Sequence, residues 1–111
     1  MSQLEEIIAV GRAKPRPEIV CQDGFTMSVQ SSWAHYCSPR PDYTERAYDA
    51  EEPGPFFSLE VGFPSERPEP WAEWKEWCDS TTETTDTVYG YVPVEAVRAL
   101  VALHGGERVA S

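Results

Sequence analysis

Three tryptophans at three-residue spacing, with acidic neighbours, form the most distinctive chemical pattern in the chain. On a helix, Trp71, Trp74 and Trp77 would lie along one side and drift slowly around the axis. Exposed indoles are frequent anchors of protein–protein interfaces and are worth about 2 kcal/mol or more each. We therefore predict a partner-binding site made of Glu69, Trp71, Glu73, Trp74, Glu76 and Trp77. Core packing of the indoles against a sheet is the competing interpretation.

The negative charge of the chain is concentrated around the same segment. Residues 42–86 carry thirteen acidic and three basic side chains, which accounts for the whole formal net charge of −10. Such a region would attract a partner protein with a basic surface. It argues against direct binding of nucleic acid, because phosphate contacts supply most of that affinity. Membrane association is not expected either, since no run approaches the roughly 18 apolar residues of a membrane span.

A second candidate site contains an imidazole, a phenol and a guanidinium close together in sequence. His35, Tyr36 and Arg40, together with the basic segment 12–16, could bind an anion such as a nucleotide phosphate. The alternative interpretation is thus a small-ligand-binding protein that sequesters a nucleotide signal. A solvated basic face paired with the acidic loop would account for the same residues.

The cysteines and histidines give only weak signals for metal binding or catalysis. Cys21, His35 and Cys37 are a possible zinc set, but their spacing is poor and small buried thiols are the commoner arrangement. Cys37 with His35 as base would lack a third, orienting group. The chain has no P-loop, no dinucleotide-binding glycine motif and no hydrolase motif. We therefore predict no catalytic residue, metal or cofactor, and favour a non-enzymatic function.

Hydrophobic periodicity and turn signals predict the elements that position these residues. Strands are expected at 18–21, 25–30, 56–63 and 87–92, and helices at 2–10, 70–78 and 93–104. In the last strand, alternation would place Tyr89 and Tyr91 on one face. The last helix carries one apolar-leaning stripe, formed by Val94, Val97, Leu100, Val101 and His104.

These elements predict an α+β fold, with a small antiparallel sheet of three to four strands and the C-terminal helix packed on one face. The expected organisation is an N-terminal helix and basic linker (1–17), a single α+β domain (18–106) and a short tail (107–111). Acidic loops are expected at 41–55 and 79–86. Three cysteines, an odd number, fit reduced thiols in a cytosolic protein.

Several segments, in this order and spacing, resemble a family of small, largely uncharacterised proteins of tailed bacteriophages and prophages. They are CQDGFTMSVQ (21–30), HYCSPR (35–40), LEVGFPS (59–65), TVYGYVP (87–93) and HGG (104–106). The resemblance implies a phage accessory protein, present in the bacterial host cytoplasm, that binds and modulates a host protein or counters a host defence. It implies no activity for particular residues, and homo-oligomerisation stays open.

Overall fold

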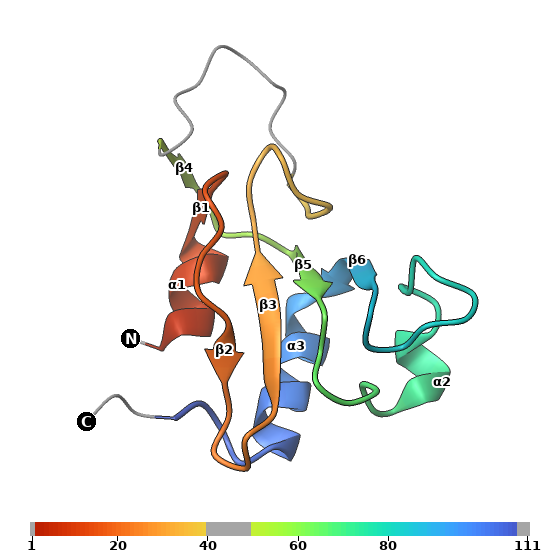
Figure 1. The fold of residues 1–111 in the computed structure, drawn as a ribbon. Helices are drawn as coiled ribbons and strands as arrows, with labels where there is room; N and C mark the ends of the chain where they lie inside the picture. The colour runs from red at the N-terminus through yellow and green to blue at the C-terminus, as the bar shows by residue number, and fades with distance from the viewer. Residues whose placement is uncertain (1, 40–49, 109–111) are drawn as a thin grey trace.

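The computed structural model describes residues 2–39 and 50–108, which form two antiparallel sheets and three helices (Figure 1). The larger sheet has the order β2-β3-β5-β6 and the smaller sheet pairs β1 with β4. The strands are β1 (Val10–Arg12), β2 (Ile19–Val20), β3 (Thr26–Gln30), β4 (Glu51–Pro53), β5 (Ser58–Gly62) and β6 (Val88–Pro93). The helices are α1 (Gln3–Ala9), α2 (Trp71–Trp74) and α3 (Val94–Leu103).

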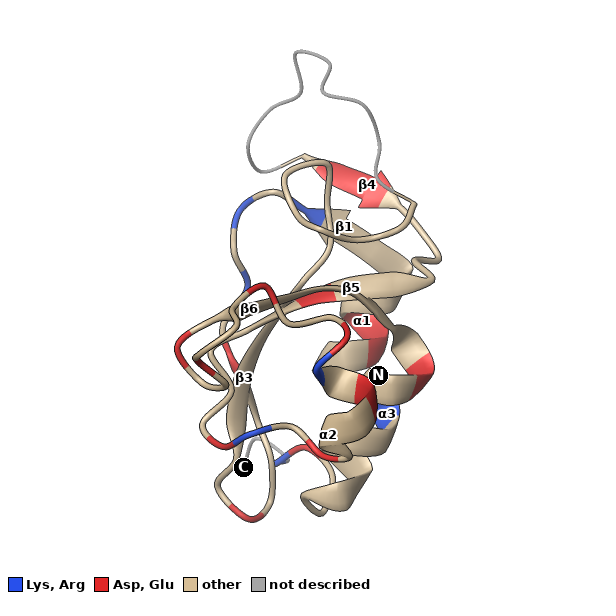
Figure 2. Ribbon diagram, turned by 90° about the vertical axis from the view of Figure 1, so that its right-hand side faces the viewer, with Lys and Arg blue, Asp and Glu red and all other residues tan. Residues whose placement is uncertain are grey.

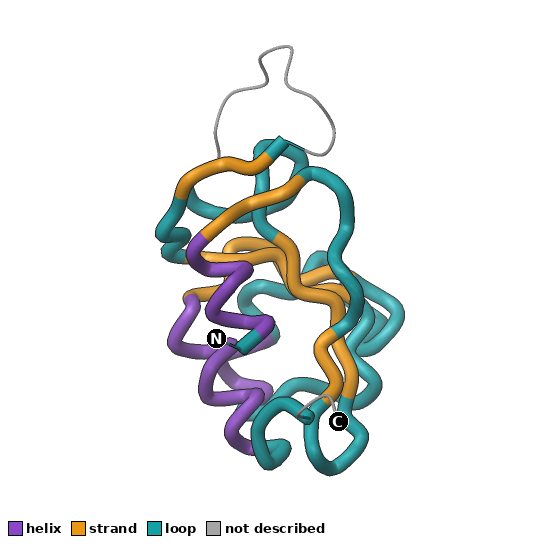
Figure 3. The backbone as a smooth tube through the Cα atoms, turned by 90° about the vertical axis from the view of Figure 1, so that its left-hand side faces the viewer, coloured by secondary structure: helices purple, strands orange, loops and turns teal. Residues whose placement is uncertain are grey.

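The core lies between the larger sheet and two helices that run side by side on one of its faces (Figure 3). Leu59 and Val61 of β5 are buried there, as are Val97 and Leu100 of α3 and Ile7 of α1. The predicted α+β class, with the C-terminal helix on one face, is therefore confirmed. No helix in the described part of the chain has the length and hydrophobicity needed to cross a bilayer.

Other segments of the chain cover both edges of the larger sheet. Along β2, Cys21 forms a bridge with Glu107, and the N–H of Arg108 donates to the carbonyl of Val20. Along β6, Cys78 forms a bridge with Tyr89. Covered edges leave few unpaired backbone groups for another chain to pair with.

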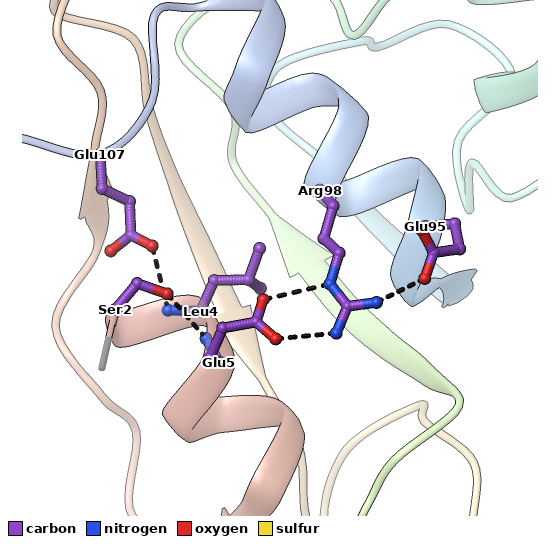
Figure 4. Close-up of polar contacts among 6 residues, drawn as sticks. All are labelled: Ser2, Leu4, Glu5, Glu95, Arg98 and Glu107. Carbon is purple, nitrogen blue, oxygen red and sulfur yellow. Dashed lines mark hydrogen bonds and ion pairs between the residues drawn. The ribbon is translucent and has the colours of Figure 1, made fainter.

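The two ends of the chain meet at the first turn of α1 (Figure 4). The Ser2 hydroxyl accepts the N–H of Glu5 at 3.1 Å, so Ser2 is the N-cap of α1. The Glu107 carboxylate accepts the N–H groups of Gln3 and Leu4 at 3.1 and 3.2 Å. Arg98 of α3 binds the Glu5 carboxylate at 2.7 Å and also pairs with Glu95, and the bond from Arg98 lowers the pKa of Glu5.

Several sequence-based expectations differ from the structure. Residues 51–53, expected in a loop, form β4 because they pair with β1, a partner far away in sequence. The predicted helix 70–78 is shorter, since α2 ends at Trp74 and turns follow. The predicted strand 56–63 is also shorter, because Phe57 and Phe63 lie just outside β5 and are 68 and 54 % exposed. Residues 40–49, most of the predicted acidic loop, lie outside the described residues.

The β2–β3 turn is fastened to the end of α3 through Asp23. One Asp23 oxygen accepts the N–H of Phe25 at 2.9 Å, and the other lies 2.7 Å from Nδ1 of His104. The His104 ring stacks on Phe25 with centroids 3.9 Å apart. The N–H of Phe25, and after it His104, hold the pKa of Asp23 below its usual range.

We predict that Asp23→Asn lowers the free energy of unfolding near pH 7. In the unfolded chain the Asp pKa is about 3.9, so the ionised form stabilises the fold above that pH, and this contribution is lost as the pH falls through the lower folded pKa. Urea denaturation of wild type and variant at neutral and strongly acidic pH measures the difference, which should shrink in acid. Asp86→Asn, the same charge change at an exposed residue, is the control. A difference of constant size at all pH values would contradict the assignment.

Candidate functional site

The three tryptophans of the predicted partner-binding site form an aromatic cluster with Tyr89. Trp74 is 1 % exposed, and its ring makes edge contacts with Trp77 at 5.3 Å and Tyr89 at 5.6 Å. Trp71 and Trp77 are half-buried. Trp74 therefore belongs to the core and has no surface to offer a partner, whereas Trp71 and Trp77 each keep an exposed part.

The three acidic residues of that predicted site are all exposed, but their contacts with the rest of the protein differ. Glu69 pairs with Arg67 at 2.7 Å and accepts the N–H of Trp71 at 3.0 Å, so it holds the start of α2. The bond from Arg67 lowers the pKa of Glu69. Glu73 and Glu76 lie on the solvent side of α2 and the turn after it. These two carboxylates are the ones placed to meet a partner.

A β-bulge in β6 decides which tyrosine is exposed. Leu59 pairs with Val92 and Val61 with Tyr89, so Gly90 and Tyr91 together lie opposite Glu60 alone. Tyr89 points into the core, whereas Tyr91 is 46 % exposed and has a φ of 54°. The expectation that both tyrosines share one face is therefore wrong, because the extra residue reverses the alternation.

The same bulge brings two distant segments together at the outer edge of β6. The N–H of Gly90 donates to the carbonyl of Trp77 at 3.0 Å, and the N–H of Tyr91 donates to the carbonyl of Tyr36 at 2.9 Å. In a regular antiparallel strand, N–H groups of consecutive residues point to opposite sides. Here both donate to segments other than β5, so the chain at Tyr36 and the chain at Trp77 are each bonded to the bulge.

We call the resulting surface the acidic–aromatic edge and define it by residues of the bulge, of its partner position in β5 and of the two segments bonded to β6: Tyr36, Glu60, Glu76, Trp77, Asp79 and Tyr91. The Tyr36 and Tyr91 rings lie 6.0 Å apart, and Tyr36 is 50 % exposed. A Glu60 oxygen accepts the N–H of Tyr36 at 2.8 Å, which fixes a carboxylate beside the rings. The N–H of Asp79 donates to the carbonyl of Val88 at 2.9 Å, so the chain at Asp79 is bonded to β6, and Asp79 is exposed.

Acidic residues also occur on other parts of the molecule. Figure 2 shows them on α1, β4 and β5 and on the loops, so the negative charge of the described residues does not form one patch. The acidic–aromatic edge is distinguished by the aromatic rings among its carboxylates.

Of the alternative ligand site, the structure describes His35 and Tyr36, whose surroundings differ. His35 is buried, and its Nδ1 lies 2.6 Å from the Ser32 hydroxyl, whereas Tyr36 faces solvent. Arg40 lies outside the described residues. Neighbouring side chains that point in opposite directions do not share a small pocket.

The zinc interpretation of Cys21, His35 and Cys37 finds no support in residues 2–39 and 50–108, where no three His, Cys, Asp or Glu side chains are grouped to hold a metal ion. Cys21 lies at the end of β2, and burial raises the pKa of its thiol. Cys37 is buried, and its thiol donates to the carbonyl of Ser32 at 3.2 Å. Both thiols are therefore buried and pack as part of the core.

Sequence reasoning did not find Tyr91 and Glu60, and it placed Tyr36 in another site. The one signal available was Gly90, because a glycine inside a strand pattern often marks a bulge. A Cβ on Gly90 would lie 3.1 Å from the Cβ of Tyr36, so the close approach of this loop suits glycine. The contact with Trp77 depends on tertiary structure and leaves no local pattern.

No family model, curated protein or solved structure matches this chain. The resemblance to phage and prophage proteins accordingly stays a prediction.

We predict that Trp74→Ala lowers the free energy of unfolding by about 3–5 kcal/mol, because it leaves a cavity in the core. Phe57→Ala, at a side chain that is 68 % exposed, should change it by less than about 0.5 kcal/mol. Chemical denaturation of the two variants measures both values. Similar losses in both would contradict the placement of Trp74 in the core.

We predict that Tyr91→Gly is more stable than Tyr91→Ala by about 1 kcal/mol. Both variants lack the ring, but only glycine adopts the positive φ of this position without strain. In a regular strand the order would be reversed, with alanine more stable. Thermal or urea unfolding of the pair tests the bulge, and a more stable alanine variant would show that the left-handed conformation is absent.

Proposed function

We propose that this protein is a non-enzymatic binding protein that recognises a basic surface of a partner protein through its acidic–aromatic edge. On the sequence resemblance, it would act as a phage accessory protein in the bacterial cytoplasm. Its partner would be a host protein that it modulates or inhibits, including a component of host defence.

The observation that carries this proposal is the strained, exposed Tyr91. A non-glycine residue with positive φ costs free energy of about 1–2 kcal/mol. Tyr91 is nevertheless 46 % exposed beside the equally exposed Tyr36. Strained backbone positions tend to occur at functional sites, where the cost is balanced by binding or catalysis.

The neighbouring groups give this surface a preferred partner. Tyr and Trp rings are favoured anchors in interfaces because they bury a large area at low entropic cost. Arginine guanidinium groups stack on such rings and pair with carboxylates, and Glu60, Glu76 and Asp79 provide these at the same edge. A basic surface would be attracted by the charges and held by the rings.

The first test is a pull-down from host lysate with wild type and Tyr36→Ala/Tyr91→Gly. We expect the double variant to lose the partner, with affinity reduced by roughly thirtyfold if one anchor worth about 2 kcal/mol is removed. Phe63→Gly is the matched control. Phe63 is 54 % exposed and also has a positive φ, 49°, but it comes directly after the last residue of β5 and is not part of the acidic–aromatic edge. Equal binding by wild type and the double variant would refute the proposed surface.

The second test concerns charge, and it uses the purified partner. Glu76→Gln should slow association, and the difference from wild type should shrink as salt rises, because salt screens exposed charges. Glu18→Gln is the control, since Glu18 precedes β2 at the opposite edge of the sheet. Association measured by surface plasmon resonance at two salt concentrations decides the question. Association rates independent of salt would exclude attraction by the carboxylates.

A further inference from the structure

A cavity of about 330 Å³ lies away from the acidic–aromatic edge, where the end of α1 meets the segment that follows β1. Its lining includes two guanidinium groups, those of Arg12 and Arg16, and two carboxylates, those of Glu6 and Glu51. Its size is at the lower end of the range for small-molecule sites.

The Arg16 guanidinium is fixed by a hydrogen bond, but one of its nitrogens has no acceptor among the described residues. Its backbone N–H donates to the Gln30 side-chain oxygen at 2.9 Å, and its Nη2 donates to the carbonyl of Val10 at 2.6 Å. Its Nη1 is buried, and within residues 2–39 and 50–108 no acceptor lies within hydrogen-bond distance. Buried charged donors nearly always have a partner, and one without a partner typically marks the place of an ion or water.

Arg12 lines the same cavity, and its guanidinium can leave its ion pair for a ligand at a small cost in free energy. Within the part of the chain that the structure describes, it forms an ion pair with Glu51 at 2.8 Å, in which the two side chains are 47 and 59 % exposed. Exposed ion pairs contribute only about 0–1 kcal/mol, so another anion can replace Glu51 easily. Burial, and after it the nearby Arg12, lowers the pKa of Arg16, whereas the charges of Glu6 and Glu51 act in the opposite direction.

A second cavity, of about 720 Å³, lies between α1 and α3 and shows the contrast. There Arg98 is paired with Glu5, and the Glu107 carboxylate is bonded to backbone N–H groups of α1. In the larger cavity Arg98 and Glu107 thus have partners, whereas in the smaller one a buried guanidinium nitrogen of Arg16 has none among the described residues.

We propose that the cavity beside Arg12 and Arg16 binds a small phosphate-type oxyanion, either free or as part of a nucleotide. One oxygen would lie against Arg12 in place of Glu51. Another would be bonded by Arg16, whose guanidinium, held by its one bond to Val10, turns slightly so that the covered Nη1 meets the ligand. Because the chain as a whole is acidic, short-range hydrogen bonds and not long-range attraction must supply the affinity.

The test is a titration with inorganic phosphate followed by ¹H–¹⁵N NMR, with sodium chloride at matched ionic strength as reference. We expect saturable shifts of the Val10, Arg12 and Arg16 amides with phosphate only. Arg12→Gln and Arg16→Gln should each weaken binding by roughly tenfold, the value for loss of one charged hydrogen bond. Lys14→Gln removes the same charge from an exposed neighbour that does not line the cavity, and it should bind as wild type does.

The solvent-facing Arg12 variant keeps the test valid if Arg16→Gln does not fold. Identical responses to phosphate and chloride, or equal weakening by Lys14→Gln, would overturn the proposal. A parallel titration with adenosine monophosphate separates the two sources of the anion. Tighter binding than phosphate would identify a nucleotide, and equal binding would identify the free anion.

Discussion

One extra residue in β6 is the constraint on which both the core and the candidate surface depend. Because Gly90 and Tyr91 share a single partner position opposite Glu60, Tyr89 and Val92 both face the core although they are three residues apart. Tyr89 thereby completes the cluster around Trp74. Tyr91 is pushed outward into a left-handed conformation that a bulky residue seldom adopts.

The bulge also determines what lies beside β6. Two consecutive N–H groups each donate to a carbonyl of a different segment, one at Trp77 and one at Tyr36. This pairing covers the edge of the sheet, which removes a site of unwanted association. It also gathers aromatic rings and carboxylates from three parts of the chain. The same hydrogen bonds therefore protect the edge of the sheet and assemble the proposed binding surface.

Much of the fold could be predicted because it follows from local chemistry. Ser2 caps α1 as expected, the Asp23-Gly24 turn joins β2 to β3, with Gly24 at a φ of 96°, and Pro93 precedes α3. The candidate site was less predictable. The segment with the strongest pattern, the tryptophan run, belongs partly to the core. A spacing of three residues between indoles fits a buried helix face as well as an exposed one. Only the contacts with Tyr89 show which indoles are buried.

The sequence by itself determined the element types, the α+β class, the acidic balance and the stock of aromatic residues. These depend on periodicity, capping and composition, which act over a few residues. Tertiary structure alone decided the pairing of β4 with β1, the burial of Trp74 and the exposure of Tyr91. Each of these depends on register or on contacts between distant segments, and neither leaves a signal in the local pattern.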